Sequence, residues 1–393
     1  MSNNNLSLEY YKTPSKYLIL RNLAFFCMLG FLVYHWFPFP PIVWRLALLG
    51  VCVIGFLIHL SRFKFTAVEK SMLFFVALNV IYYFFSFMWQ TPETTNFGNV
   101  LCSMLPIPLF FTIAANGAIT QKSLTVFLIL SCIAGYFYFN HAESLILERL
   151  LRGEPGGITI NASTVFLVII PLLFFVRNRW MTIGISVIII FFIIYGAKRG
   201  NIISAALPFY LLARMKMKSN RSLISEVLLI IVVIAISYFA YYTMMNSEYL
   251  VSRIEKTFEG DSSYRNIIYA TAFDTWLNAE AINVFFGYGT DGTINLIGIR
   301  AHNDWLEILV DFGLLGVLVY LIFFICMVRA IHRNKHNLQL FYAFLAVFFI
   351  WFSKSLYSMG FTNDIFSFLS AVIGMVLGLE YRQRQGLPIY SKN

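Results

Sequence analysis

The stretch WLEILVDFGLLGVLVYLIFFICMV, residues 305–328, decides the fold class of this chain. It exceeds the ~20 predominantly apolar residues that a helix needs to cross the hydrocarbon core of a bilayer. Its only charged residues, Glu307 and Asp311, lie near its beginning. We therefore predict a membrane-spanning helix that starts close to a polar face of the protein.

Similar apolar runs recur on both sides of this stretch, separated by short polar segments. Hydrophobic residues make up 59% of the 393 residues and charged residues 12%, about half the ~25% typical of soluble domains. The runs are continuous rather than alternating, which disfavours a closed β-barrel. The sequence predicts an all-α polytopic membrane protein, a single domain over residues 1–393 with about 12 transmembrane helices. The expected spans are 18–37, 42–61, 71–89, 99–115, 123–139, 160–176, 180–195, 200–213, 223–243, 305–328, 338–356 and 362–379.

The basic residues indicate how these spans are oriented. If the N-terminus is cytoplasmic, most of the 29 lysines and arginines fall in cytoplasmic segments, as the positive-inside rule requires. Both termini are then expected inside. The net charge of +10 follows mainly from topology, and no nucleic-acid partner is expected. Some basic residues are expected near the outer face, against the positive-inside rule, including Lys198, Arg199, Arg265, Arg300 and Lys354. An anionic ligand bound on that side would explain their positions.

Two outer loops are expected, a moderate one at 140–159 and one large loop at 244–304. Within the large loop, residues 264–286 place several apolar side chains on one helical face, which predicts an amphipathic helix lying at the outer membrane interface. The segment GYGTDG at 287–292 interrupts the chain with glycines. Gly287 and Gly289 allow either a tight turn or a close backbone approach to a ligand.

The next helix is expected to begin beside a histidine. In RAHNDWLEILVDFGLLGVLVY, residues 300–320, Asp304 with Glu307 three positions later has the pattern of a capping box. We expect the helix to start there, with free N–H groups toward the outer side. Gly313 and Gly316 form a small-residue face against which another helix can pack closely.

Four segments in this order resemble the O-antigen ligase and polymerase superfamily. They are AKRGN at 197–201, SSYRNIIY at 262–269, FFGYGTDG at 285–292 and RAHNDWLEILVDFGLLG at 300–316. The resemblance covers roughly residues 160–330, which we take as the ligase/polymerase-like core region. It implies a GT-C-like glycosyltransferase fold in the bacterial inner membrane, with the active site on the periplasmic face and no cofactor.

The resemblance also implies the substrates and the principal site residues. The donor would be an oligosaccharide linked to undecaprenyl diphosphate, and the acceptor a glycolipid, either a lipid-linked repeat unit or lipid A core. Membrane lipids and a chain-length regulator are further candidate partners. Arg199, Arg265 and His302 would be the functional positions, with Arg300 as an additional diphosphate ligand.

The residue types suit this chemistry. An arginine stays protonated and offers paired donors, so Arg199 and Arg265 can bind a diphosphate and hold it more tightly as charge develops on it. His302 is the candidate general base for the acceptor hydroxyl, because neighbouring arginine charges favour its neutral form near pH 7. Asp304 or Glu307 can orient the imidazole or bind sugar hydroxyls. Asn303, Lys198 and Lys354 complete the set of expected supporting residues.

Each of these residues also has a simpler interpretation. Arg199 can extend to the lipid headgroups beside Lys198. Arg265 can pair with Asp261 or Asp274 across the loop. Gly287 to Gly292 can be an ordinary turn, and Lys354 an interfacial anchor. No metal site is expected, because His302 lacks the HxxH or HExxH spacing and no Asp-x-Asp pair occurs in an outer loop.

Three functions remain in competition. We favour a polymerase of O-antigen or capsular polysaccharide that transfers the glycan with inversion and without a metal. The outer loop of about sixty residues is modest for docking a lipopolysaccharide core, which weighs against the alternative, an O-antigen ligase. A transporter or flippase for polyisoprenoid glycans should show an internal repeat and ionisable groups near the midplane of the bilayer, and the sequence shows no convincing repeat.

Overall fold

A computed structural model describes residues 13–88, 94–152, 160–196, 198–216 and 265–390 of the chain. Every regular element in these ranges is helical. Eight helices there are long and apolar enough to cross a membrane, so the chain is a multi-pass membrane protein. The expected span at 223–243 and residues 244–264 of the large loop lie outside the described ranges.

The first half of the chain forms helices close to the expected spans. The bounds are α1 Ser15–Leu32, α2 Pro41–Arg62, α3 Ala67–Ser86, α4 Thr94–Met104, α5 Pro106–Ala115 and α6 Gln121–Leu151. The break between α4 and α5 falls at Pro106, because proline lacks the N–H that a continuous helix needs. The prediction of a loop from residue 140 is wrong, since α6 continues to Leu151. Helix-forming residues and an i,i+4 ion pair between Glu148 and Arg152 (3.8 Å) extend it.

The second half follows the same pattern, with one irregular segment. The expected span 160–176 consists of short pieces, η2 Asn161–Ser163, α7 Thr164–Val168 and η3 Ile170–Phe175. Pro171 prevents a regular helix here. Residues 162–175 are buried throughout, and irregular backbone is tolerated at membrane depth only where protein covers it. The remaining helices are α8 Arg179–Tyr195, α9 Arg199–Lys216, α12 Arg265–Leu277, α13 Ala281–Phe286, α14 Gly292–Ile297, α15 Asp304–Arg333, α16 Leu338–Tyr357, η4 Asp364–Phe366 and α17 Ser367–Arg384.

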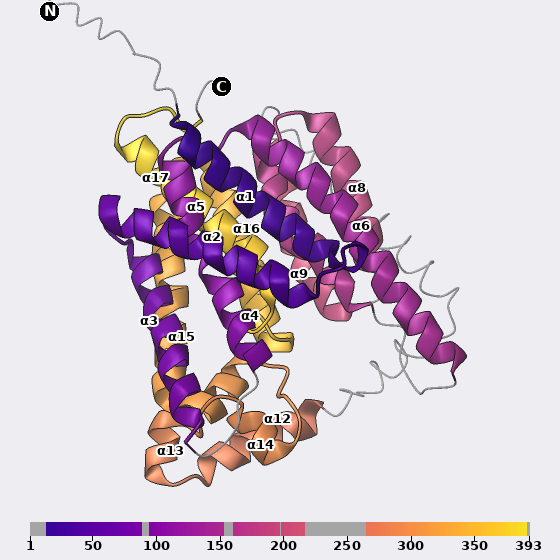
Figure 1. Ribbon diagram of the computed structural model, residues 1–393, viewed down its shortest axis with the longest axis vertical. Coiled ribbons are helices and arrows are strands. Elements are labelled where there is room, and N and C mark those ends of the chain that lie inside the picture. Colours follow the sequence, from indigo (N-terminus) through magenta and orange to yellow (C-terminus); the bar gives the residue numbers. More distant parts are fainter. Residues whose placement is uncertain (1–12, 89–93, 153–159, 197, 217–264, 391–393) are drawn as a thin grey trace, which may run out of the picture.

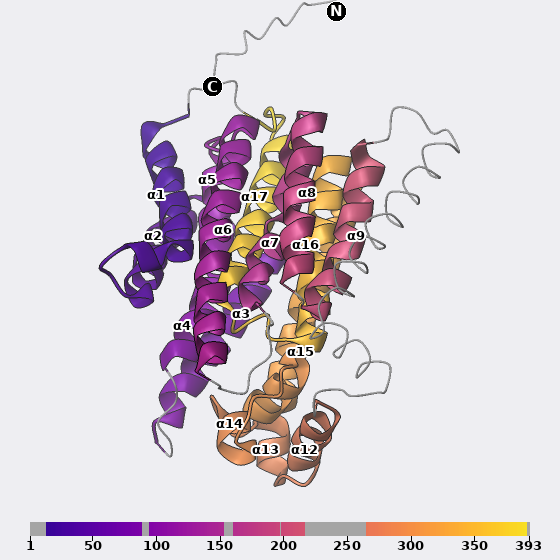
Figure 2. The ribbon, with the colours of Figure 1, turned by 90° about the vertical axis from the view of Figure 1, so that its right-hand side faces the viewer.

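Helices α5 and α17 lie at the centre of the bundle. A side chain at Gly374 or Gly378 of α17 would come within 2.5 Å of the α5 backbone. These glycines therefore let the two helix backbones approach closely, as small residues do in membrane bundles. The other long helices surround this pair (Figure 2).

The bundle has two distinct ends. The Thr13 hydroxyl donates to the Gly117 carbonyl (3.0 Å), and Arg382 donates to the Ala115 carbonyl (3.3 Å), so the beginning of α1 and the end of α17 meet at one end. Helices α12 to α14 form a cap at the opposite end (Figure 1). The segment predicted as one amphipathic helix over 264–286 is two helices, α12 and α13, separated at residues 278–280.

Gly313 allows α13 to dock on α15. It interrupts α15 with a φ of 63° and a ψ of −163°, a conformation that is almost exclusive to glycine. A Cβ at this position would lie 2.5 Å from the Phe285 carbonyl group. The prediction of a close approach at Gly313 is thus confirmed. Gly316 instead makes room for Phe312 and Ile308 of the same helix.

Replacing Gly313 by alanine is expected to destabilise the cap by at least the ~1–3 kcal/mol that such backbone strain costs, because the new methyl group also meets the end of α13. Thermal unfolding in detergent measures the loss. Gly184→Ala in α8, where a Cβ meets no atom within 4 Å, is the matched control and should be neutral or slightly stabilising. Equal melting temperatures for the two variants would contradict this role of Gly313.

Candidate functional site

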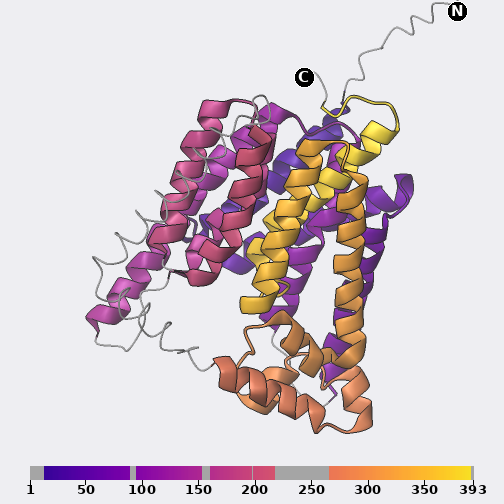
Figure 3. The same cartoon turned by 180° about the vertical axis from the view of Figure 1, so that it is seen from behind.

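The residues singled out from the sequence gather where the cap meets the ends of α9, α15 and α16. Arg265 is the first residue of α12, and His302 lies in the turn that leads from α14 to α15. Lys198 directly precedes α9, and Lys354 lies in the last turn of α16. Figure 3 shows the cap below the ends of α15 and α16. Segments far apart in the sequence therefore build one region.

His302 has an unusual backbone. Its φ is 54°, and Asp291 is the other described non-glycine residue with a positive φ. The Asn303 side chain caps α15 by accepting from the amides of Trp305 (2.9 Å) and Leu306 (3.1 Å). The prediction that α15 begins here is confirmed, but the cap is Asn303 rather than Asp304. Two of the expected free N–H groups are consequently occupied.

The imidazole of His302 is surrounded by positive charge. Partial burial lowers its pKa below the usual 6.5, and the charges of Arg265, Arg300 and Lys198 lower it further. The ring is therefore mainly neutral at pH 7, and a neutral ring has one nitrogen that can accept a proton. The Tyr269 hydroxyl lies 3.4 Å from the His302 carbonyl oxygen and donates to it, which ties the turn to α12.

Three cations next to this turn form what we call the cationic cluster: Lys198, Arg265 and Lys354. Arg265 donates to the Tyr357 carbonyl (2.9 Å) at the end of α16. The lysines each donate to a neutral amide oxygen, Lys198 to Asn161 (2.9 Å) and Lys354 to Asn201 (2.9 Å). The charges of Lys198 and Arg265 act on Lys354, so the three groups lie near one another.

Within the described part of the chain the positive charge of this cluster is only partly balanced, because the buried Asp304 carboxylate acts on Lys354. No acidic side chain there forms an ion pair with Lys198, Arg265 or Lys354. Asp274 does not pair with Arg265, and Asp261 lies outside the described residues. Burial, and then the charge of Arg265, lowers the pKa of Lys198 to about 8. Such a cluster gains stability from binding an anion.

Asn201 holds the buried Lys354 in place. Lys354 is 1% exposed and Asn201 is fully buried. The Asn201 amide nitrogen donates to the hydroxyls of Ser163 (2.8 Å) and Thr164 (3.2 Å), which leaves its oxygen facing the ammonium group. Arg199 is the first residue of α9 and lies next to Lys198 in the sequence. The interpretation of Lys354 as an exposed interfacial anchor does not fit its burial.

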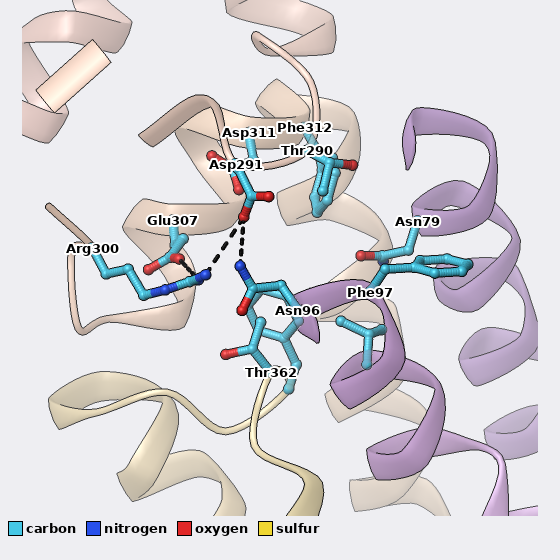
Figure 4. Close-up of a pocket in the computed structure, with 12 residues that line it drawn as sticks. Asn79, Asn96, Phe97, Thr290, Asp291, Arg300, Glu307, Asp311, Phe312 and Thr362 are labelled. Atoms are coloured by element: carbon cyan, nitrogen blue, oxygen red, sulfur yellow. Dashed lines mark hydrogen bonds and ion pairs between the residues drawn. The ribbon is translucent and has the colours of Figure 1, made fainter. Parts of the chain in front are cut away.

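Arg300 has a different environment from the cationic cluster. It binds Glu307 (2.8 Å) and lies 3.5 Å from Asp291, which also accepts from Asn96 (2.8 Å). Figure 4 shows Arg300 between these two carboxylates. The adjoining cavity measures about 20 Å³, enough for one water molecule and far too small for a sugar or a diphosphate. Arg300 and Glu307 thus connect the cap to the bundle, and their role as substrate ligands is not supported.

The glycine segment is a turn. The Gly287 amide donates to the Asn283 carbonyl (2.7 Å), and the Gly289 amide donates to the Asp311 carbonyl (2.8 Å). A Cβ at Gly287 would lie 2.4 Å from the backbone of Asp311. These glycines therefore let the loop approach α15, and their amides are not available to a phosphate. Of the two interpretations of Gly287 and Gly289, these contacts favour the turn over the phosphate cradle.

Several contributing residues were not found from the sequence. Asn161 and Asn201 hold the two lysines, Tyr269 holds the His302 carbonyl, and Gly360 binds Asp304 (2.9 Å). Asn201 had a detectable signal, because it is a polar residue in AKRGN at the start of an apolar helix. Gly360 had none, because its partner lies 56 positions away in the chain.

Comparison with known proteins supports the resemblance stated above. The family model described as O-antigen ligase matches residues 162–321, which include Lys198, Arg265 and His302. No curated protein matches the chain significantly. The matched residues include α7 to α9, the cap and the first half of α15. Over residues 162–321 the chain is therefore similar to the O-antigen ligase family.

Proposed function

We propose that this protein is a polymerase of lipid-linked O-antigen or capsular polysaccharide that works at the periplasmic face of the bacterial inner membrane. The observation that carries the proposal is the neutral imidazole of His302 beside Lys198, Arg265 and Lys354, which form no ion pair with an acid of the described residues. This combination suits a base that acts next to a bound polyanion. The family accounts for an enzyme of the ligase or polymerase type, and the specific reaction is our inference.

The donor in this proposal is a glycan linked to undecaprenyl diphosphate. Its diphosphate carries about two negative charges, and a further charge develops as the bond between the sugar and the phosphate breaks. Arg265 and Lys198 would bind the outer phosphate oxygens. Arg199, the first residue of α9, and Lys354, which lies deeper in the protein, would add to the positive charge around the diphosphate. Stabilising the leaving group in this way can contribute ~3–4 kcal/mol, the value of one good oxyanion donor.

The acceptor in this proposal is a sugar hydroxyl of the next lipid-linked repeat unit. Its oxygen attacks the anomeric carbon from the side opposite the leaving group, and the carbon–oxygen bond to the diphosphate breaks. The hydroxyl proton passes to the free ring nitrogen of His302. The product has an inverted anomeric centre, and undecaprenyl diphosphate leaves. Every step uses side chains of this chain alone.

We infer the orientation of the protein in the membrane from its basic residues and from the two ends of the helix bundle. Positive-inside counting predicts that both termini are cytoplasmic, and the cap lies at the other end of the bundle from the beginning of α1 (Figure 2). Several apolar side chains on the surface of α12 and α13 are exposed, including Ile267 (63%), Ile282 (63%) and Phe285 (57%). A cap that rests on the outer leaflet would bury them in lipid and place the site within reach of a lipid-linked donor.

The closest rival is a ligase that transfers the finished glycan to lipid A core. It would use the same donor site and the same base, and would differ only in the acceptor. A transporter of polyisoprenoid glycans is the rival from another class. The charges of the cationic cluster lie at one end of the bundle, whereas a transporter is expected to carry them near the midplane of the bilayer.

Reconstitution separates the three functions. The purified protein is placed in liposomes with a synthetic undecaprenyl diphosphate oligosaccharide, with and without lipid A core. We expect a ladder of longer lipid-linked chains in the absence of lipid A core. Transfer only to added core would replace polymerase by ligase, and movement across the bilayer without new glycosidic bonds would overturn the proposal of an enzyme. Protein with His302→Ala is the matched control.

A further inference from the structure

Asp304 is the first residue of α15 and lies two positions after His302. It is fully buried. Its carboxylate accepts from the amides of Gly360 (2.9 and 3.1 Å) and Phe361 (3.3 Å) and from the Tyr320 hydroxyl (2.9 Å). Burying a carboxylate is costly unless hydrogen bonds replace those of water. These contacts satisfy the group inside the protein, and none of them points to a substrate.

The residues on either side of Asp304 bind the same part of the chain. Asn303 donates to the Leu356 carbonyl (3.1 Å), and the Trp305 indole donates to the Ser355 hydroxyl (3.0 Å). Three consecutive residues after His302 are therefore fixed to the end of α16 and to residues 358–363, which we call the α16–α17 connector. A non-glycine residue with a positive φ, such as His302, persists only where its surroundings enforce that conformation.

We propose that Asp304 is a positioning residue that acts through the connector, holding the His302 imidazole beside the cationic cluster in the orientation that accepts the acceptor proton. This inference rests on the proposed function, because it assigns His302 the role of base. It differs from the expectation that Asp304 touches the imidazole or a sugar hydroxyl. Asp304 instead fixes the backbone from which the imidazole projects.

Gly360 gives a selective way to disturb this arrangement. A Cβ there would lie 2.9 Å from Oδ2 of Asp304. Apart from the two adjacent residues, the next nearest group would be the Phe366 ring, at 3.2 Å. Gly360 does not have a left-handed φ, so alanine fits its backbone. The methyl group therefore presses mainly on the carboxylate. Gly50→Ala in α2, where a Cβ meets nothing within 4 Å, is the matched control.

Transfer kinetics give the first measurement. Gly360→Ala and Asp304→Ala are expected to lower kcat by about 10²-fold, because a displacement of a catalytic group by about 1 Å has that effect. KM for the lipid-linked donor should stay unchanged in Gly360→Ala, since that variant keeps the Asp304 charge near Lys354 and Arg265 is held by the Tyr357 carbonyl of α16. Asp304→Asn should fall between wild type and Asp304→Ala, because its amide oxygen can still accept from Gly360.

The pH profile distinguishes positioning from a general loss of folded protein. The groups that face His302 are Arg265 and Tyr269 of α12, Arg300 of the turn, and Lys198 before α9. Partial burial, and then these three charges, hold the pKa of His302 below 6.5. An imidazole that moves away from them regains a higher pKa, so the acid limb of kcat/KM should shift to higher pH in Gly360→Ala. A smaller active fraction would lower the whole profile without moving that limb.

Titration of His302 by NMR in isotope-labelled protein follows the same shift without any activity. An unmoved His302 titration and full transfer in Gly360→Ala would overturn the positioning role. If Gly360→Ala behaves like the wild type in both measurements while His302→Ala is inactive, the proposed function stands and only the role of Asp304 fails. If His302→Ala is fully active, the assignment of the base itself fails, whatever Gly360→Ala does.

Discussion

Replacing His302 by alanine is expected to lower kcat for glycan transfer by about 10²–10⁴-fold, the usual contribution of a general base. The His302 imidazole lies in the turn before α15, beside the cationic cluster. Its lowered pKa keeps it mainly neutral at pH 7, so it can accept a proton. Activity of the wild type should accordingly persist to pH values below 6.5 and fall only as the ring becomes protonated. A discontinuous assay over a range of pH measures both effects.

The loss should come from chemistry rather than folding. The His302 side chain is exposed, so its removal should leave the melting temperature nearly unchanged. His336→Ala, at an exposed position near the other end of α15, is the matched control and should keep full activity. A His302→Ala protein that transfers glycan at the wild-type rate would exclude this residue as the base.

Replacing Arg265 by alanine should lower kcat by about 10²–10³-fold, as expected for loss of one donor to a charge that develops in the transition state. Arg265 is fixed by the Tyr357 carbonyl (2.9 Å) and keeps further donors for a phosphate. Arg265→Lys should recover part of the rate, since lysine supplies the charge but not the paired geometry. Single-turnover transfer from the synthetic donor measures the chemical step.

Arg152 offers a matched control for the arginine. It is also expected on the outer side, it is exposed, and it pairs only weakly with Glu148 (3.8 Å) among the residues that the structure describes. Arg152→Ala should leave transfer unchanged, because exposed pairs of this kind contribute little. Equal losses in the Arg152 and Arg265 variants would mean that the enzyme responds to net outer charge rather than to a specific phosphate ligand.

Much of the fold follows directly from the run lengths. The expected spans at 42–61 and 338–356 coincide within about one residue with α2 and α16. Three features escaped prediction for physical reasons. Hydropathy does not register the polar but helix-forming extension of α6. It also does not reveal that the apolar residues 160–176 form irregular turns buried by other helices, or that residues 278–280 divide the helix predicted over 264–286.

The candidate site was only partly predictable. Resemblance to the superfamily and the excess of outer basic residues pointed to Arg265, His302 and Lys198, which the structure brings together. Other residues have partners that local patterns do not predict: Arg300 and Glu307, expected as ligands beside the histidine, form an ion pair with each other. Contacts such as Asp304 with Gly360 join residues 56 positions apart. A single sequence gives no direct signal for such pairs.

The most direct test of the central claim is accessibility of position 302 from the outer side. A single cysteine is placed at this position, in a background with the native cysteines replaced, and intact cells are treated with a maleimide that does not cross the inner membrane. We expect labelling from the periplasm, and protection when the lipid-linked donor is bound. Labelling only after the membrane is opened to expose the cytoplasmic side would contradict a periplasmic site.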